Sequence, residues 1–416
     1  MKKIFIISVC LIFVISCSSE KKVSLPKRIS VKAGASIQKA IDKASPGDLI
    51  ILETGTYNGD VVVSTNDLTI RGKDRNNTII DGKYKQDNGF IIAANGVRIE
   101  NLTVQKFRTN GILFQGGYES DTTNTSTPDV LDRYKVQYVN ALNNGLYGIY
   151  AFSSKNGVIA NTYTKANADA GIYIGQCKPC NALVTGNIAE DNGLGFQGAN
   201  ASKELYIFTN NFSNNRAGIH LLSETKETKS PQEGVVVKGN LASKNNNDSA
   251  PTTTPDLYGF GIVIAGGNDN IVENNRTEEN IQVGIALVEN NAFLPSNNSF
   301  KGNFSRNNGS PFGFDLAYLI SGRPDVMSLG NCFENNSYSS SSIDKIQTVL
   351  PCTGAAPGPF KSQPLKNFKV PDAPSYDSIS VETLKQENIK KINSIPGKLK
   401  KISKPDLSQI GVPSAE

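Results

Sequence analysis

A short motif that recurs every 23 or 24 residues, where no polar insertion intervenes, constrains the fold of this chain more than any other feature of its sequence. The motif is a glycine followed by an apolar residue, a variable residue and, in most copies, a second apolar residue. Its copies begin at Gly111, Gly148, Gly171, Gly195, Gly218, Gly261, Gly284 and Gly313. A second series of turns, out of phase with the first, begins at Gly186, Asn210, Gly239, Asn274, Gly302 and Gly330.

This repeat predicts a solenoid built from short strands. Alternation with a period of two indicates strands, and a coil of this length cannot bury its apolar side chains unless it stacks on its neighbours. Asparagines at equivalent turns can form an amide ladder between coils. The Leu-x-x-Leu-x-Leu pattern of leucine-rich repeats is absent. We therefore expect an all-β chain, a single-stranded right-handed parallel β-helix over residues 29–352.

The start of the solenoid carries a predicted cap and a family resemblance. Residues 36–44 are amphipathic, with Ser36 as a suitable N-cap, and predict an N-terminal capping helix. The strands at 49–52 and 55–57, with the later segments Leu68–Gly72 and Ile79–Gly82, resemble the opening of pectin-lyase-like right-handed β-helix proteins. This resemblance covers roughly residues 29–340 and implies the fold.

A closer resemblance rests on three further segments. Gly175–Ala182, Asn215–Ile219 and Ile264–Gly267 are similar to a group of bacterial right-handed β-helix repeat proteins without established activity. The match is specific, but it implies no mechanism.

The first residues predict export and a lipid anchor. Lys2 and Lys3 precede a short apolar run over residues 4–15, which is typical of a signal peptide comprising residues 1–16. The run ends in Val14–Cys17, which resembles a bacterial lipobox and implies lipidation of Cys17. Ser18 and Ser19 resemble the outer-membrane sorting pattern. We expect a lipoprotein on a tether of residues 17–28. The alternative is ordinary secretion, in which Cys17 has no special role.

Charge and composition restrict the partners. The net charge of +5 falls to +3 without the two N-terminal lysines, which is too small to indicate nucleic-acid binding. One histidine and two methionines make a copper or zinc carrier improbable. We expect a monomer without cofactor or resident metal, Ca²⁺ being conceivable but unsupported. Residues 353–416, rich in proline and lysine, are expected to be solvated, lying along the solenoid or partly disordered, with a short helix around residues 380–393.

Four cysteines remain after the signal peptide and the lipidation site are set aside. An even number in an exported chain favours disulfides, with three possible pairings. We expect Cys177 and Cys180 to close a small loop, and Cys332 and Cys352 to fasten the C-terminal cap. A redox Cys-x-x-Cys normally opens a helix, whereas this one follows a strand, so redox activity ranks low and a zinc site lower.

The repeat also predicts one exposed row of side chains. Two residues after successive glycines stand Tyr150, Tyr173, Gln197, His220, Val263, Ala286 and Asp315, expected to face outward about 4.8 Å apart from coil to coil. Tyr150, Tyr173, Gln197 and His220 would suit a sugar chain lying along the solenoid axis. Alternatively, such residues merely populate an exposed sheet, where their β propensity favours them.

Catalytic candidates are few. Two residues before the glycines stand Asp169, Arg216 and Gln282, so Asp169 and Arg216, with His220, are the candidates for catalysis. The clustered aspartates of polygalacturonases and the Asp-Pro-His-Asp signature of alginate epimerases are missing, and a second carboxylate for hydrolysis cannot be assigned. Insertions at 118–134, 177–181, 223–234 and 290–298 would line one edge of the row, and that at 245–257 the opposite edge.

These observations lead to one main hypothesis and two alternatives. The main hypothesis is an envelope-anchored β-helix lipoprotein that binds a polysaccharide along one solenoid face and could also process it. The first alternative is a non-catalytic structural or interaction lipoprotein at the cell surface. The lower-ranked one is a polysaccharide lyase or glycoside hydrolase with an unrecognised site.

Overall fold

The computed structural model describes residues 25–117, 130–226, 228–290, 292–320, 325–354, 356, 358–381 and 385–415. The expected signal peptide, the expected lipidation site at Cys17 and most of the expected tether lie outside these residues. Within them, no helix is long and apolar enough to cross a membrane.

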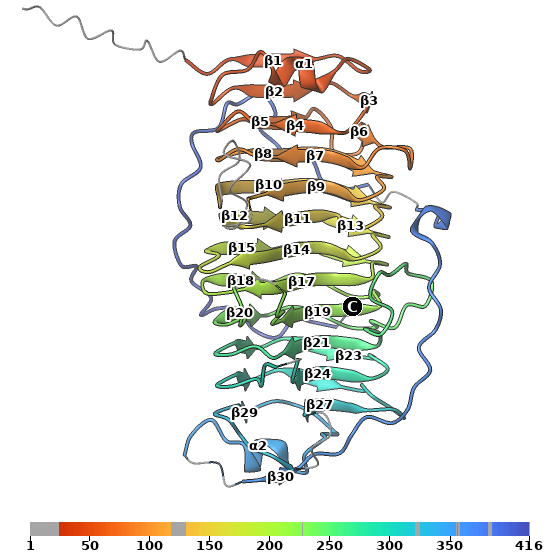
Figure 1. The fold of residues 1–416 in the computed structure, drawn as a ribbon, viewed down its shortest axis with the longest axis vertical. Helices are drawn as coiled ribbons and strands as arrows, with labels where there is room; N and C mark the ends of the chain where they lie inside the picture. The colour runs from red at the N-terminus through yellow and green to blue at the C-terminus, as the bar shows by residue number, and fades with distance from the viewer. Residues whose placement is uncertain are drawn as a thin grey trace, which may run out of the picture.

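The chain forms a parallel β-helix, as predicted, whose coils stack along one axis (Figure 1). One wall is a ten-stranded parallel sheet made of β4 (Val61–Val63), β7 (Asn88–Ile92), β9 (Asn110–Gln115), β11 (Ile149–Phe152), β14 (Ala170–Cys177), β17 (Leu194–Ala201), β19 (Ala217–Leu222), β21 (Phe260–Ala265), β24 (Val283–Val288) and β27 (Phe314–Leu319).

A sixteen-stranded sheet forms the other wall. Its main path contains β1 (Arg28–Val31), β2 (Leu49–Leu52), β5 (Thr69–Gly72), β8 (Arg98–Gln105), β10 (Leu131–Leu142), β12 (Ser154–Ala160), β15 (Ala182–Thr185), β18 (Leu205–Phe208), β20 (Val235–Lys238), β22 (Ile271–Glu273), β25 (Ser299–Lys301) and β29 (Cys332–Glu334). Off this path lie β3 (Gly55–Tyr57), β6 (Thr78–Asp81), β13 (Tyr163–Lys165) and β16 (Ile188–Glu190). Two small sheets pair β23 (Arg276–Glu278) with β26 (Phe304–Arg306), and β28 (Asp325–Val326) with β30 (Phe360–Lys361).

The register of the ten-stranded sheet confirms which side chains face the core. The residue after each repeat glycine pairs with its equivalent in the next coil, through Ile149, Ile172, Phe196, Ile219, Ile262 and Ile285. All six are fully buried in one continuous core. Because side chains alternate along a strand, the following residue of each strand faces outward.

Asparagine ladders connect the coils where the strands turn, as predicted. In one ladder, Asn192 Nδ2 donates to Asn215 Oδ1 at 3.0 Å and to the carbonyl of Thr164 at 3.1 Å, so the amide satisfies backbone and side-chain groups together. This ladder runs through Asn144, Asn167, Asn192, Asn215, Asn245, Asn280 and Asn308. A second runs through Asn187, Asn210, Asn240, Asn275, Asn303 and Asn336.

One predicted member of the second ladder belongs elsewhere. Asn331 accepts a hydrogen bond from Asn298 in a third ladder, which also contains Asn270. Its expected place beside Asn303 is taken by Asn336. Spacing alone could not distinguish the two, since both asparagines lie at turns of the same last coil.

Short helices lie at the ends of the stack. At the N-terminal end, α1 (Ile37–Ile41) is shorter than the predicted 36–44, and the hydroxyl of Ser36 accepts a hydrogen bond from the Lys39 amide at its N-terminus. Its residues Ile37, Ala40 and Ile41 are buried. At the other end lies α2 (Ile346–Val349), next to the disulfide that joins Cys332 to Cys352.

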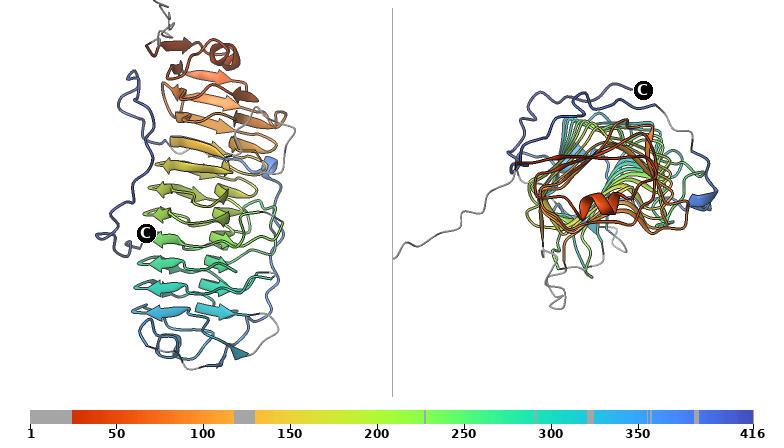
Figure 2. Two further views of the ribbon diagram at one scale, coloured as in Figure 1. Left: turned by 60° about the vertical axis from the view of Figure 1, so that its left-hand side comes forward. Right: turned by 90° about the horizontal axis from the view of Figure 1, so that it is seen from above.

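The described residues of the tail, 353–416, lie along the outside of the coils (Figures 1 and 2). They run from the C-terminal end towards the N-terminal coils, and then back along another side. The described residues of 380–393 form no helix; a single 3₁₀ turn, η1 (Tyr376–Ser378), precedes them, which corrects the prediction. Arginines of the solenoid fix the tail by donating to its backbone carbonyls: Arg71, Arg75, Arg98, Arg216 and Arg276.

Candidate functional site

One outward-facing row of the ten-stranded sheet brings together the residues expected to bind a ligand. In register from coil to coil it contains Leu113, Tyr150, Tyr173, Gln197, His220, Val263, Ala286 and Ala317, which we call the outer row. Strand pairing fixes these side chains at about 4.8 Å intervals on one face. The four residues predicted to bind substrate are therefore consecutive neighbours.

Asp315 does not belong to this row, which corrects the expectation. Ala317 takes the place that spacing from Gly313 assigned to Asp315. Asp315 is 1 % exposed, and its carboxylate accepts hydrogen bonds from the amides of Asn308, Ser339 and Ser340. It therefore ends the asparagine ladder of Asn308 and is a structural residue.

An aromatic cluster forms one end of the polar part of the row. The ring of Tyr150 stacks on Tyr147 with centroids 4.5 Å apart, and lies edge-on to Tyr173 at 4.6 Å. Phe152 follows at 5.9 Å from Tyr150. Tyr173 is 4 % exposed, whereas Tyr147 and Tyr150 are half-buried. The sequence prediction missed Tyr147 and Phe152, although both flank the motif at Gly148 and add apolar surface to the same face.

Gln197 and His220 form the polar middle of the row. They are paired on adjacent strands, Gln197 being 8 % exposed and His220 half-buried. Within the described part of the chain, neither Gln197 Oε1 nor His220 Nδ1 has a hydrogen-bond partner, although both atoms are buried. Burial lowers the pKa of His220 to about 4, so its imidazole is neutral near pH 7. Buried polar atoms that lack a partner are costly, and an ordered water or a bound group would satisfy them.

The two remaining catalytic candidates hold a loop and the tail. Arg216 is fully buried and donates to the carbonyl of Pro371 at 2.6 Å, and at 3.5 Å to those of Asp248 and Ala250. Asp169, 7 % exposed, accepts a hydrogen bond from the Thr253 hydroxyl at 2.7 Å. Both contacts reach the insertion at 245–257, which lies along this edge of the sheet as predicted.

Burial affects the acid chemistry of Asp169. It raises the pKa of the carboxyl, while hydrogen bonds from Thr253 and Tyr147 act in the opposite direction. Arg216 is committed to carbonyl groups and lies 4.8 Å from the centre of the Tyr258 ring. The structure thus gives both residues a fastening role beside the outer row.

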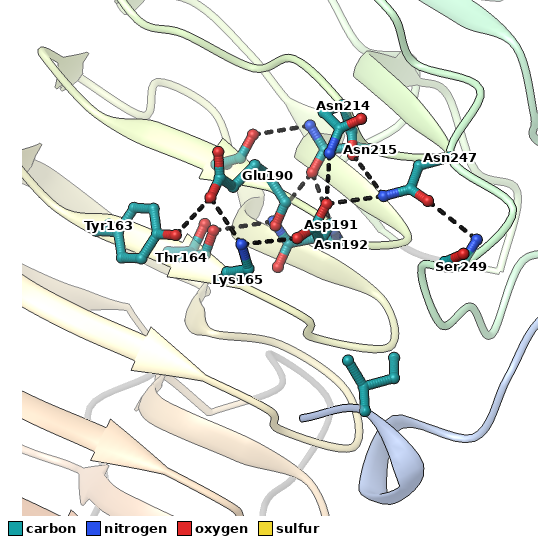
Figure 3. A network of polar contacts seen from close by, with 12 residues as sticks. Tyr163, Thr164, Lys165, Glu190, Asp191, Asn192, Asn214, Asn215, Asn247 and Ser249 are labelled. Atoms are coloured by element: carbon teal, nitrogen blue, oxygen red, sulfur yellow. Dashed lines mark hydrogen bonds and ion pairs between the residues drawn. The ribbon is translucent and has the colours of Figure 1, made fainter. Parts of the chain in front are cut away.

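A separate charged network surrounds the acidic pair Glu190 and Asp191 (Figure 3). Lys165 lies 2.9 Å from Glu190 and 2.8 Å from Asp191, and the Tyr163 hydroxyl donates to Glu190 at 2.5 Å. Burial raises the pKa of Glu190, but the bonds from Tyr163 and Lys165 bring it below its ordinary value. Asn247 also donates to Asp191, at 2.7 Å. Both carboxylates form ion pairs with Lys165, so the network is a structural connection between coils.

The remaining cavities offer less chemistry. A cleft of about 630 Å³ lies between residues 409–415 of the tail and the turns at Gly186, Thr209 and Gly239. Amide and hydroxyl side chains line it together with aliphatic ones, and no charged side chain is among the lining residues. Among the described residues, no group of three or more histidine, cysteine or acidic side chains is placed to hold a metal ion.

The Cys177–Cys180 disulfide belongs to the core rather than to a reactive surface. The structure pairs Cys177 with Cys180 and Cys332 with Cys352, the pairing expected from the sequence. Cys177 is 2 % exposed and Cys180 fully buried, so a redox partner has no access to this bond in the folded chain.

This arrangement predicts the thiol content of the folded protein. When it is denatured without reductant and treated with a thiol reagent, we expect no labelled cysteine among the four, because all are paired. Reductant added before unfolding should leave the buried Cys177–Cys180 bond intact. Two labelled thiols at residues 177 and 180 in the native protein would instead indicate redox activity.

Comparison with known proteins adds the handedness of the coil. A family model described as "Right handed beta helix region" matches residues 61–232. No curated protein matches the sequence. The matched region lies within the parallel β-helix that the structure shows.

Solved structures give distant likenesses. The A-module of a mannuronan C-5 epimerase from Azotobacter vinelandii is 14 % identical, with a TM-score of 0.47 over 75 % of this chain and 95 % of that one. A pectate lyase is 16 % identical, with a TM-score of 0.46 over 80 % and 83 %. An alginate lyase from Paenibacillus sp. is 14 % identical, with a TM-score of 0.35 over 76 % and 99 %.

Proposed function

We propose that the chain binds a polysaccharide along the outer row, from Tyr150 to His220. The observation that carries this proposal is the tyrosine cluster on the outer row, followed on the next two strands by the amide of Gln197 and the imidazole of His220. Aromatic faces provide contact area for the apolar faces of sugar rings, and the amide and neutral imidazole can hydrogen-bond to hydroxyl groups. Successive strands repeat these contacts along the solenoid axis.

The same geometry supports binding without a defined catalytic step. The residues of the outer row supply no carboxylate, and Asp169 and Arg216 are engaged by the loop at 245–257 and by the tail. His220 would be a feeble base, because its pKa lies near 4. A lyase or hydrolase activity would require catalytic side chains that come together only when the ligand binds. An assay for turnover of a bound glycan would reveal such an activity.

Glycan binding is tested with Tyr150→Ala. We expect the wild-type protein to retain at least one polysaccharide on a glycan array, and this variant to bind it about tenfold or more weakly, on the order of 1.4 kcal/mol. Tyr150 is half-buried, so its loss should leave folding intact; Tyr173 is nearly fully buried, and its removal would also destabilise the sheet.

Tyr138→Ala is the matched control, since Tyr138 is a half-buried tyrosine of β10 in the other sheet. Equal affinity of both variants would move the site away from the outer row. Failure of the wild-type protein to bind any glycan would favour a scaffold that presents its loops to protein partners.

We further propose that the protein is anchored to the cell envelope, in the outer membrane, through lipid on Cys17. The proposal rests on the signal-peptide and lipobox pattern of residues 1–17. Cys17→Ala is expected to abolish labelling by radioactive fatty acid and to leave uncleaved or soluble protein, because the thiol is the acylation site. Persistent labelling of this variant would contradict the anchor.

A further inference from the structure

The middle of the tail is held largely by its backbone, and its lysine side chains are exposed. On the sixteen-stranded sheet, Arg71 Nη1 donates to the carbonyls of Lys391, Ile392 and Ser394 at 2.7–3.0 Å. Arg98 Nη2 donates to the carbonyl of Gly397 at 2.6 Å. These arginines are 3 % and 9 % exposed, so they form a fixed base beneath the segment.

The segment that they hold is strongly cationic. Residues 385–404 contain seven lysines and a single acid, Glu387. Every one of these lysines is exposed: Lys385, Lys390, Lys391, Lys398, Lys400, Lys401 and Lys404. Lys398 also lies 3.4 Å from Asp67 and remains 75 % exposed. We call residues 385–404 the lysine strip.

Five aliphatic side chains lie among the lysines, together with amide and hydroxyl side chains. Ile395 is 40 % exposed, and Ile392, Leu399 and Ile402 are half-buried. The strip contains no aromatic residue, unlike the outer row. Lysines interleaved with partly exposed aliphatic side chains suit a lipid surface, where the charges contact headgroups and the apolar groups enter the interface. A sugar-binding surface would instead present aromatic rings and amides.

The strip also lies near the N-terminal end of the solenoid. Its carbonyls are bound by β5 and β8, in the first coils after β1 (Figure 1). If Cys17 carries lipid, as proposed above, twelve residues from Cys17 to Arg28 reach at most about 40 Å, which keeps these coils close to the bilayer. We propose that the lysine strip contacts a membrane surface that carries anionic lipid headgroups.

Vesicle binding tests this proposal independently of the lipid anchor. The protein is produced without residues 1–17, since the whole described fold follows them, and is mixed with phosphatidylcholine vesicles that contain or lack phosphatidylglycerol. We expect binding to the anionic vesicles alone, weakening as salt is raised. Replacing Lys390, Lys391, Lys400 and Lys401 by Gln should lower the partition coefficient by at least about tenfold.

The matched control replaces four exposed lysines elsewhere, Lys345, Lys361, Lys366 and Lys369, by Gln. It removes the same charge and should retain most of the binding. Equal losses in the two variants, or equal binding to neutral and anionic vesicles, would overturn the proposal. Absence of vesicle binding together with strip-dependent binding to an acidic polysaccharide would also overturn it, and would assign the strip to a glycan.

Discussion

Replacing Ile219 by Asp is expected to lower the free energy of unfolding by about 4 kcal/mol or more. Ile219 is fully buried in the core and pairs with Phe196 and Ile262 in the adjacent coils. A carboxylate at this place would lose its hydration and find apolar side chains above and below it. The coils on either side would lose packing as well, because each coil is stabilised chiefly by its neighbours. Thermal or denaturant unfolding followed by circular dichroism measures the effect.

Ile271→Asp is the matched control for this variant. Ile271 also lies on a strand of the solenoid, β22, but its side chain is 42 % exposed, so the carboxylate remains hydrated. We expect a change within about 0.5 kcal/mol for this control. Similar losses for the two variants would show that the inward and outward faces have been assigned wrongly. In that case the residues of the outer row would face the core, and the proposed binding site would be wrong.

The regular part of the fold could be predicted because its determinants are local. An apolar residue after each glycine and an asparagine at each turn repeat the same environment in every coil, and the structure places them accordingly. The prediction failed in the last coil, where Phe314 pairs with Val283. Phe314 follows Gly313 whereas Val283 precedes Gly284, so the register is shifted relative to the earlier coils. Counting from Gly313 therefore assigned Asp315 to the outer row wrongly. Such counting is valid only where each repeat glycine keeps the same position in the strand register.

The candidate site was predicted less completely, since long-range contacts decide which of its residues are accessible. The sequence identified Tyr150, Tyr173, Gln197 and His220 as neighbours, and strand pairing alone ensures that. It gave no sign that Thr253, 84 residues away, would bond Asp169, or that Pro371, 155 residues away, would accept a hydrogen bond from Arg216. No spacing rule encodes these partners, because insertions and the tail follow no repeat.

The tail itself was the least predictable element. Its composition suggests a solvated segment, and its lysines are indeed exposed. Its order comes from carbonyl groups, which are identical in every sequence, and from arginines scattered over five distant positions of the solenoid.

Replacing Arg71 by Leu should show how strongly the tail depends on these arginines. Arg71 bonds Glu100 through Nε at 2.8 Å and Nη2 at 2.6 Å, and both side chains are at most 3 % exposed. Removing one partner leaves a buried carboxylate without its main countercharge and deprives three tail carbonyls of their donor. We expect the free energy of unfolding to fall by about 3 kcal/mol or more.

The double variant Arg71→Leu/Glu100→Leu separates the ion pair from the hold on the tail. Removing both charges relieves the buried carboxylate, so much of the lost stability should return. The carbonyls of Lys391, Ile392 and Ser394 still lack their donor, so trypsin should cleave at Lys390 and Lys391 faster than in the wild-type protein in both variants. If the single variant unfolds like the wild type, the ion pair contributes little. If cleavage stays slow in both variants, the tail is held by its other contacts, and Arg71 does not control its attachment to the solenoid.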